Sequence, residues 1–439
     1  MSIELITLLI IVTFIILLLS GLPLAWVMGA TSVIFALILF GPSVMPMLVA
    51  RVYDMMLNYT LVAIPLFVLM ASILQRSGAA EWLFRAVHVW SGGLRGGLAV
   101  GTVIACTAMA AMVGIIGAEI VTFGLVALPA MLARNYDKRI ALGSICAGGG
   151  MASLIPPSIV FIVYAMVSGA SVGALFIAGI VPGLLLAALF VAYIVLRSHL
   201  NPELAPAAPP EERGITLREK LRLLRGLVLP FFLAVAVLGS IYAGVATPTE
   251  AAGIGCVGAL IVSACHRSLS IQNVKQSLFD TLKVTCMLVW LFFGAQTLIG
   301  VYMLAGGAQF VQNTVTGLPF GRWGIIVVMQ LILIFLGMFL DWIGIVLLTM
   351  PLFIPIIKAH GFDIVWFGVV FCMNMQISYL SPPFGPACFY MKSVSPPEIT
   401  LGDIYKSVWP FLLLIVAALI LTMVFPQLSL WLPSQMLMR

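Results

Sequence analysis

Two short stretches of this chain combine adjacent prolines with apolar sequence. One reads LIPPSIVFIVY, from Leu154 to Tyr164, and the other reads LSPPFGPACFY, from Leu380 to Tyr390. Proline removes a backbone donor and clashes with the preceding turn, so a Pro-Pro pair breaks an apolar helix. A break exposes carbonyl oxygens, which suit Na⁺, and a helix N-terminus, which carries about half a positive charge and suits a carboxylate. The chemistry that these stretches predict is binding of a cation and an organic anion.

Two acids lie deepest in apolar sequence, Glu119 and Asp341. A charge at the centre of a membrane helix costs about 2.5–3.5 kcal/mol on insertion scales, so both acids are functional candidates. The alternative is that each carboxylate caps the tip of a helical hairpin by accepting backbone N–H bonds. The polar residues nearest the breaks are Ser158, Asn374, Gln376 and Ser381. Each of these can contact a ligand or satisfy backbone groups that the prolines free.

The composition indicates that membrane helices position these residues. The chain has 439 residues, of which 63% are hydrophobic and 8% charged, whereas soluble domains are about 25% charged. Each membrane span needs roughly 20 apolar residues, which leaves room for about ten to twelve spans. The seven cysteines include no CxxC pair, so we expect free thiols rather than a disulfide or metal framework.

Apolar stretches separated by polar turns predict the order of the helices. In the first half we expect helices at 3–20, 24–40 and 61–75, an interfacial arm at 51–59, a helical hairpin at 97–132, a broken helix at 140–168 and a helix at 173–197. In the second half we expect helices at 227–246, 250–265 and 277–305, a hairpin at 323–357, a broken helix at 364–391 and a final helix at 406–426. The predicted fold class is an all-α polytopic membrane protein.

The two halves repeat one unit, as the spacing of four landmarks shows. Glu119 precedes Pro129 by ten residues, and Asp341 precedes Pro351 by the same number. Asp137 lies nineteen residues before the first proline pair, and Asp363 lies nineteen before the second. The sequence therefore predicts a duplicated unit, in which a re-entrant hairpin is followed by a Pro-Pro broken helix.

Charge predicts the orientation of these repeats. If the N-terminus is outside, the loops at 76–95, 134–139, 197–225, 267–283 and 392–406 face the cytoplasm. They hold every Lys and Arg of the chain except Arg51, Arg322, Lys358 and Arg439. Cytoplasmic loops carry the excess of positive charge. The two hairpins then open to opposite sides, as in the inverted repeats of secondary transporters.

The predicted order divides the chain into seven parts. They are scaffold helices with the interfacial arm (1–96), a first transport repeat (97–168), a scaffold helix (169–197), a cytoplasmic linker with an amphipathic helix (198–226), scaffold helices (227–306), a second transport repeat (307–391) and a C-terminal helix (392–439). Within the linker, ITLREKLRLLRG places Leu and Arg on different faces and predicts a basic helix that lies on an anionic membrane surface.

Several other functions lack their motifs. No Gly-Lys dipeptide occurs, so no Walker motif is present, and no HExxH motif occurs. GASVG, from Gly169 to Gly173, matches GxSxG by letter, but it joins two apolar helices where a hydrolase needs a strand. We therefore expect neither an ATPase nor an enzyme. The net charge of +6 follows the membrane topology and does not predict nucleic-acid binding.

Five motifs together resemble the large permease (M) subunit of TRAP transporters, the tripartite ATP-independent periplasmic transporters. They are NYDKR (135–139), AGGGMASLIPPSI (147–159), PGLLL (182–186), ATPTEAA (246–252) and LSPPFGPACF (380–389). The resemblance covers nearly the whole chain. GIIGAE and SPPFGPACFY are similar to the branch labelled for mannitol, chloroaromatic and 2-oxo acid uptake.

The resemblance implies an elevator-type, Na⁺-coupled importer of organic anions in the bacterial inner membrane. It also implies two partners, a small four-helix membrane subunit and a soluble periplasmic substrate-binding protein. Many family members carry hydroxyl side chains at the hairpin tips, where this chain has Val113, Ile115, Trp342 and Ile343. Backbone carbonyls, Asp341 or Glu119 must then hold the ion.

We therefore expect two sets of site residues. The expected substrate contacts are Glu119, Ser158, Asn374, Gln376, Ser381 and Gly385. The expected Na⁺ ligands are Gly114, Gly117, Ile155, Pro156, Gly337, Asp341, Ser381 and Pro382. No organic cofactor is expected.

The predicted function is cation-coupled uptake of a small carboxylate, with the substrate held between the hairpin tips and the two breaks. Three alternatives remain at this point. A stand-alone anion carrier of similar fold would need no binding protein, an intramembrane enzyme would need a nucleophile and a base, and a passive channel would show uncoupled current.

Overall fold

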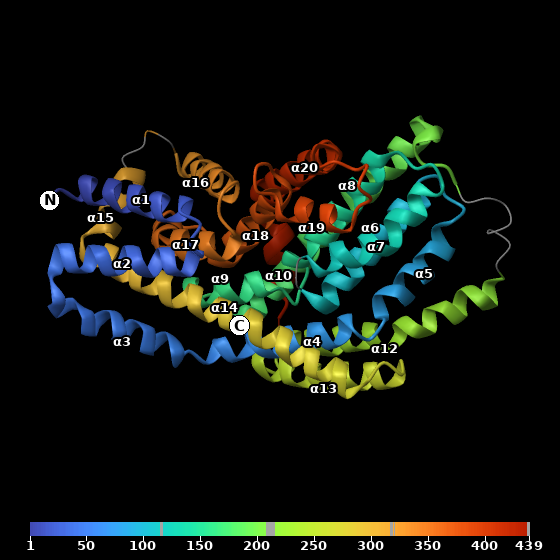
Figure 1. Ribbon diagram of the computed structural model, residues 1–439, viewed down its shortest axis with the longest axis horizontal. Coiled ribbons are helices and arrows are strands. Elements are labelled where there is room, and N and C mark those ends of the chain that lie inside the picture. Colours follow the sequence, from blue (N-terminus) through green and yellow to red (C-terminus); the bar gives the residue numbers. More distant parts are fainter. Residues whose placement is uncertain (115–116, 208–215, 317–318, 320, 437–439) are drawn as a thin grey trace.

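The computed structural model describes residues 1–114, 117–207, 216–316, 319 and 321–436. Every regular element within these residues is a helix, which confirms the all-α fold class (Figure 1). The first half contains α1 (Ile3–Leu19), α2 (Leu24–Phe40), η1 (Pro42–Val44), α3 (Met45–Met56), η2 (Tyr59–Val62), α4 (Ala63–Gln75), α5 (Ala79–Ser91), α6 (Gly97–Val113), α7 (Ala118–Leu132), α8 (Lys138–Gly150), η3 (Met151–Ser153), α9 (Ile159–Ser168), α10 (Val172–Leu200) and η4 (Pro202–Leu204). The second half contains α12 (Leu217–Tyr242), α13 (Pro248–Cys265), α14 (Ile271–Leu304), α15 (Gly307–Thr316), α16 (Arg322–Gly337), α17 (Trp342–Ala359), α18 (Ile364–Leu380), α19 (Pro386–Val394), α20 (Leu401–Val424) and α21 (Gln427–Ser434).

Full-length spans are fewer than the ten to twelve predicted. In the described part of the chain, 5 helices are long and apolar enough to cross a membrane, or up to 6 if the bent pair Pro42–Met56 and Tyr59–Gln75 is one span. The long helices are α10, α13, α14, α17 and α20. Other apolar helices are only 10–17 residues long, and α6, α7, α16 and α18 are among them. Much of the apolar sequence thus folds into shorter helices that turn back or break.

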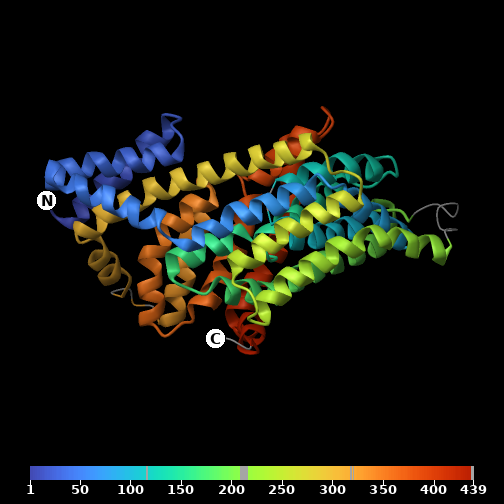
Figure 2. The same ribbon diagram turned by 90° about the horizontal axis from the view of Figure 1, so that it is seen from below.

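Both predicted hairpins are present. Helices α6 and α7 turn back on each other after Val113, and α16 and α17 do so after Gly337. Figures 1 and 2 show the α6–α7 hairpin and the α16–α17 hairpin on opposite sides of the central helix α18. This arrangement brings both tips toward the middle of the molecule.

Both broken helices begin at an aspartate and are interrupted at a proline pair. Asp137 accepts a hydrogen bond from the backbone N–H of Arg139 at 2.9 Å and starts α8. Asp363 accepts from the N–H groups of Val365 and Trp366 at 2.7 and 3.0 Å and starts α18. An Asp cap satisfies N–H groups that have no partner within the helix. The first break separates α8 and η3 from α9, and the second separates α18 from α19.

The predicted surface helix is not a separate element. One continuous helix, α12, runs from Leu217 through the basic segment to Tyr242 in the apolar one. Thr216 and Glu219 form a capping box that starts the helix at the basic end. Gly226 lies within this helix. The absence of a side chain there lets Trp82 of α5 pack closely, since an added Cβ would lie 2.9 Å from the Trp82 ring.

The first part of the predicted linker is packed rather than loose. The Leu204 carbonyl accepts a hydrogen bond from the backbone N–H of Asp137 at 2.8 Å, and the Ala205 carbonyl accepts from that of Gly96 at 2.9 Å. Ala205 is fully buried. This segment therefore fastens the start of α6 to the start of α8. Residues 208–215 of the predicted linker lie outside the described residues.

Smaller differences concern helix ends. The predicted arm at 51–59 is part of a longer bent element that starts at Pro42. Helix α14 starts at Ile271, six residues earlier than expected. Short helices α5, α15 and α21 were not expected, because their mixed polar and apolar sequence resembles loops.

Candidate substrate and ion site

The two broken helices are joined by a hydrogen bond between side chains. Gln376 of α18 donates from Nε2 to Ser153 Oγ of η3 at 2.5 Å, and both residues are buried. Gly150 makes this approach possible, since an added Cβ would lie 3.0 Å from Gln376 Oε1. Gln376, predicted as a substrate contact, thus also holds the two repeats together.

The tip of the first hairpin is wedged between two other elements. Gly114 has φ +61° and lies so close to the Pro157 carbonyl of the first break that any Cβ would overlap its oxygen. Gly117 has φ +95°, and an added Cβ would lie 2.7 Å from the ring of Tyr390 in α19. A left-handed backbone in closely packed surroundings explains why both positions are glycine. Ile115, where many family members carry a hydroxyl side chain, lies outside the described residues.

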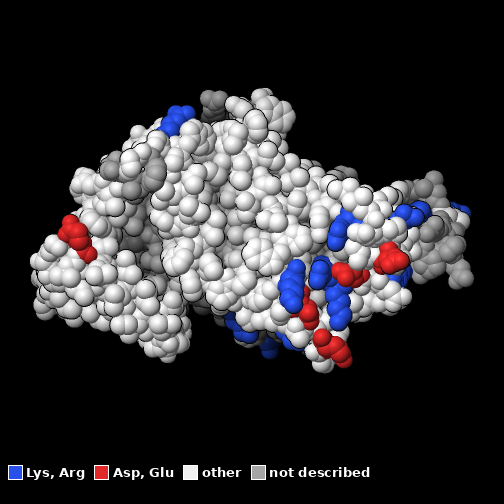
Figure 3. All heavy atoms as spheres, turned by 90° about the horizontal axis from the view of Figure 1, so that it is seen from above, with Lys and Arg blue, Asp and Glu red and all other residues white. Residues whose placement is uncertain are grey.

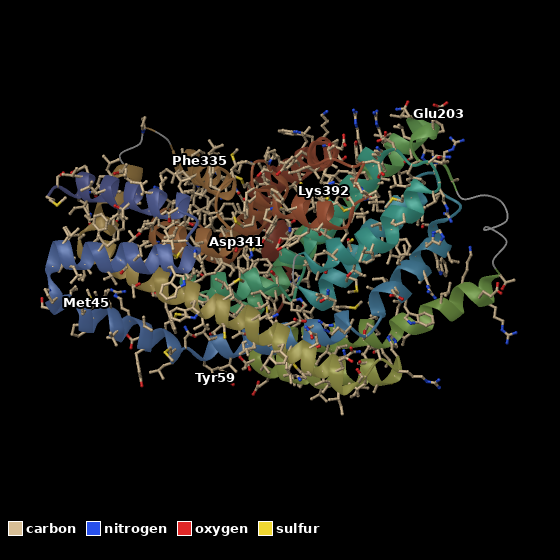
Figure 4. All side chains as sticks on the ribbon, in the orientation of Figure 1. Met45, Tyr59, Glu203, Phe335, Asp341 and Lys392 are labelled. Atoms are coloured by element: carbon tan, nitrogen blue, oxygen red, sulfur yellow. The ribbon has the colours of Figure 1, made fainter. Side chains whose placement is uncertain are left out.

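The second hairpin tip is held by α18. Gly337 packs against the side chain of Ser378, where a Cβ has no room. Asp341 is the N-cap of α17, and its Oδ2 accepts a long hydrogen bond from the Ile343 N–H at 3.5 Å. Figure 4 shows Asp341 close to the middle of the molecule. Asp341 therefore has the capping role that we considered as an alternative.

Glu119 has a different environment, although it occupies the matching position of the first repeat. It lies in the first turn of α7, where its side chain is 1% exposed. Among the described residues neither carboxylate oxygen has a hydrogen-bond partner. A buried carboxylate without a partner is costly, and a cation at this position would offset that cost. The two acids therefore share a position in the repeat but not a structural role.

Two predicted substrate residues satisfy neighbouring groups. Ser158 donates from Oγ to the Ser153 carbonyl at 2.5 Å, which pairs a carbonyl beside the first break. Asn374 donates from Nδ2 to the backbone carbonyl and to Oε1 of Gln330 in α16, at 3.0 and 2.8 Å. Asn374 thus connects α18 to the second hairpin, and its own Oδ1 has no partner among the described residues.

The second break is more accessible than the first. Pro383 and Phe384 are exposed, and the Pro383 carbonyl accepts a hydrogen bond from Tyr405 Oη at 2.9 Å. The predicted residue Gly385 has φ +29° at the start of α19, and Pro382 is half-buried.

The first break is enclosed. The predicted ligands Ile155 and Pro156 are both buried, and Ile155 packs against Gly183 of α10. Only the carbonyls and side chains of the second break are therefore close to the molecular surface.

Three hydroxyl groups without partners lie just before the second break. Ser378, Tyr379 and Ser381 are buried, and among the described residues their oxygens make no hydrogen bond. Only Ser381 was among the predicted site residues. The signal for the other two was their position immediately before the proline pair. Ser153 and Gln330 had no local signal, because their partners lie 223 and 44 residues away in sequence.

The unpartnered side chains near the second break offer oxygen atoms as ligands. No group of three or more His, Cys, Asp or Glu side chains that could hold a metal occurs in the described part of the chain. Hard cations such as Na⁺ prefer oxygen ligands, including carbonyls and hydroxyls. The unpartnered hydroxyls of Ser378, Tyr379 and Ser381, together with Asp341, provide that type of ligand.

Apolar helices, two hairpins and two broken helices define a polytopic membrane protein of the secondary transporter class. The family model described as "Tripartite ATP-independent periplasmic transporter, DctM component" matches residues 11–428. The chain belongs to this family, the large permease component of TRAP transporters, as the motifs predicted.

Curated relatives cover nearly the whole chain. The C4-dicarboxylate TRAP transporter large permease DctM of Pseudomonas aeruginosa is 32% identical over 91% of this chain and 92% of the relative. The ectoine/5-hydroxyectoine large permease UehC of Ruegeria pomeroyi is 32% identical over 96% of this chain and 97% of the relative. The 2,3-diketo-L-gulonate large permease YiaN of Escherichia coli is 28% identical over 93% of this chain and 94% of the relative. These relatives are permeases, which confirms a transporter rather than an enzyme.

Solved structures support the fold alone. MtrF of Neisseria gonorrhoeae superposes with a TM-score of 0.59 at 13% identity, covering 89% of this chain and 85% of MtrF. The YdaH transporter of Alcanivorax borkumensis gives a TM-score of 0.52 at 16% identity, covering 88% of each chain. Both are membrane transporters, and the second was described as having an unusual topology.

Proposed function

We propose that this chain is the permease subunit that imports a small organic acid by using a Na⁺ gradient. It receives the acid from a periplasmic binding protein and works with a small four-helix membrane subunit. The names of the relatives support an organic acid, since C4-dicarboxylates, ectoine and diketogulonate all carry a carboxylate. The branch for mannitol, chloroaromatic and 2-oxo acid uptake stays a prediction.

One observation carries this proposal. The first hairpin tip packs on the first break at Gly114 and Pro157, while the second packs on α18 at Gly337 and Ser378. The unpartnered hydroxyls of Ser378, Tyr379 and Ser381 lie just before the second break, where freed carbonyls suit a cation and a helix N-terminus suits a carboxylate.

The proposed mechanism is of the elevator type. The repeats at 97–168 and 307–391 form the mobile unit, and the remaining helices form a scaffold that binds the small subunit. The distribution of Lys and Arg supports a periplasmic N-terminus in the bacterial inner membrane. Under this orientation the first hairpin opens to the cytoplasm and the second to the periplasm.

The test is uptake into liposomes that contain this chain and its small subunit. We expect uptake of a labelled organic acid only when the binding protein and an inward Na⁺ gradient are both present. Uptake driven equally well by K⁺ would reject Na⁺ coupling. Uptake without the binding protein would instead support a stand-alone anion carrier, and current without coupling would support a channel.

A further inference from the structure

A polar pocket lies outside the candidate site, between the arm, α14 and the end of α9. Its volume is about 220 Å³. Its polar lining consists of Arg51, Asp54, Asn58 and Gln296, and Met166 and Val167 of α9 form an apolar wall. In Figure 4 the arm helix α3 runs along the edge of the molecule between the labels Met45 and Tyr59, below α14.

The packing of Arg51 leaves its guanidinium group available. Arg51 is half-buried and lies across Gly300 of α14, where an added Cβ would be 2.6 Å from Cδ and 2.7 Å from Nε. The Nε–H group points to Met47 Sδ at 3.3 Å, which is a weak acceptor. Asp54 is three residues away, but in the described part of the chain the only ion pair joins Arg76 and Asp280. Among the described residues, no carboxylate therefore takes the donors of the Arg51 guanidinium.

We propose that this pocket binds the carboxylate of a small organic acid on the periplasmic side, before the acid reaches the hairpin tips. This inference rests on the proposed function and orientation. Guanidinium binds a carboxylate through two parallel hydrogen bonds, and the side-chain amides of Asn58 and Gln296 supply further donors. The apolar wall of Met166 and Val167 can cover the carbon skeleton of the acid.

The pocket also joins the proposed scaffold to the proposed mobile unit. Arg51 and Gln296 belong to the scaffold, whereas Met166 and Val167 end the broken helix of the first transport repeat. Movement of that repeat removes one wall of the pocket. The acid is then held at the periplasmic side only while the mobile unit stays in the position seen here.

Charge-selective thiol labelling tests this site without transport. Gln296→Cys is introduced and labelled in spheroplasts with two membrane-impermeant methanethiosulfonates, the anionic sulfonatoethyl and the cationic trimethylammonioethyl reagents. Each rate is divided by the rate with free 2-mercaptoethanol. The chain without the new cysteine gives the background from native thiols such as Cys286, which is exposed. We expect the anionic reagent to be favoured about three- to tenfold, as a nearby unpaired cation would produce.

Matched variants identify the cause of the preference. Arg51→Gln should bring the ratio to about one, Arg51→Lys should keep it above one, and Asp54→Asn should increase it by removing the opposing charge. The neutral reagent methyl methanethiosulfonate should react at an unchanged rate in all variants, which shows that the pocket keeps its shape. Succinate should slow labelling in the parent but not in Arg51→Gln, while the neutral succinamide should slow neither.

Three results would overturn the proposal. They are a ratio near one in the parent, a ratio unaffected by Arg51→Gln, and a charge preference without protection by succinate. Labelling only in inverted vesicles would reject the periplasmic placement. If uptake fails but labelling behaves as expected, the pocket is supported and the proposed function is rejected. If uptake behaves as expected but labelling does not, only the pocket is rejected.

Discussion

At the scale of single residues, both the backbone conformation and the packing at position 114 require glycine. Its φ of +61° favours glycine, and its Cα faces the Pro157 carbonyl with no room for a Cβ. Gly169 has a similar φ of +73°, but nothing lies within 4 Å of an added Cβ. The two positions therefore separate the cost of backbone conformation from the cost of lost packing.

Gly114→Ala should abolish uptake and lower the thermal midpoint of the purified protein, because the hairpin tip must move away from the first break. Gly169→Ala should cost only the left-handed backbone, about 1–2 kcal/mol, and keep uptake. Thermal unfolding in detergent and liposome uptake measure both effects. Equal losses in the two variants would show that the contact with Pro157 does not matter.

Glu119 and Asp341 should respond in opposite ways to loss of charge. Glu119→Gln replaces a buried carboxylate that has no partner among the described residues with a neutral amide, so the thermal midpoint should stay level or rise. Na⁺-driven uptake should fall about tenfold or more if the variant loses an ion contact worth about 1.4 kcal/mol. Asp341→Ala removes the side-chain cap of α17, so stability should fall by about 0.5–2 kcal/mol.

Measurements of uptake against Na⁺ concentration and of thermal unfolding, made on both variants, test this pair. Unchanged uptake in Glu119→Gln would remove Glu119 from the site. A stability loss in Glu119→Gln as large as that in Asp341→Ala would contradict the different roles that the structure gives the two acids.

At the scale of elements, the bond between Gln376 and Ser153 couples the two broken helices. In a double-mutant cycle of Gln376→Met and Ser153→Ala, the coupling free energy should be about 0.5–1.5 kcal/mol, as for a net hydrogen bond. Unfolding in denaturant measures this value. The pair Gln330 and Asn374 provides the matched control, since their bond joins α18 to the second hairpin instead. A coupling free energy near zero would mean that this hydrogen bond does not stabilise the contact between the two broken helices.

The elements themselves were largely predictable, because their signals are local. Asp137 and Asp363 cap the broken helices, and Thr247 and Glu250 form a capping box at the start of α13. The continuity of α12 was missed because the composition changes from basic to apolar near Gly226 and Pro230, two residue types that disfavour a helix interior.

The candidate site was predictable only in outline. The breaks and Asp341 carry a local pattern, whereas the partner of each buried amide is set by tertiary packing. Asn374 and Gln376 are two residues apart, yet one bonds to α16 and the other to η3. The helical period predicts that the two side chains leave α18 on different faces, but nothing local identifies the element that lies on each face.

At the scale of the whole molecule, charge is unevenly distributed. Figure 3 shows most Lys, Arg, Asp and Glu side chains of this face at the right-hand end, and few elsewhere. The cationic loops that we predicted to be cytoplasmic include the ends of α4, α7 and α13. This asymmetry is the basis for the proposed orientation.

Native Cys265, exposed at the end of α13, gives a direct test of that orientation. An impermeant maleimide should leave Cys265 unlabelled in intact cells and label it in inverted vesicles. A cysteine placed at Ser43, which is exposed in η1 after α2, should show the reverse. Labelling of Cys265 from outside would invert the topology and require the first hairpin to open to the periplasm.

The packed segment at 202–205 has a consequence for how the protein is made. Its carbonyls pair the backbone N–H groups of Gly96 and Asp137, at the two ends of the first hairpin. Chains are synthesised from the N-terminus, so the hairpin leaves the ribosome well before the residues that fasten its base. An insertion intermediate that ends before Leu204 therefore carries a hairpin with two unpaired anchor points, and biogenesis of the first repeat is complete only once α10 has been made.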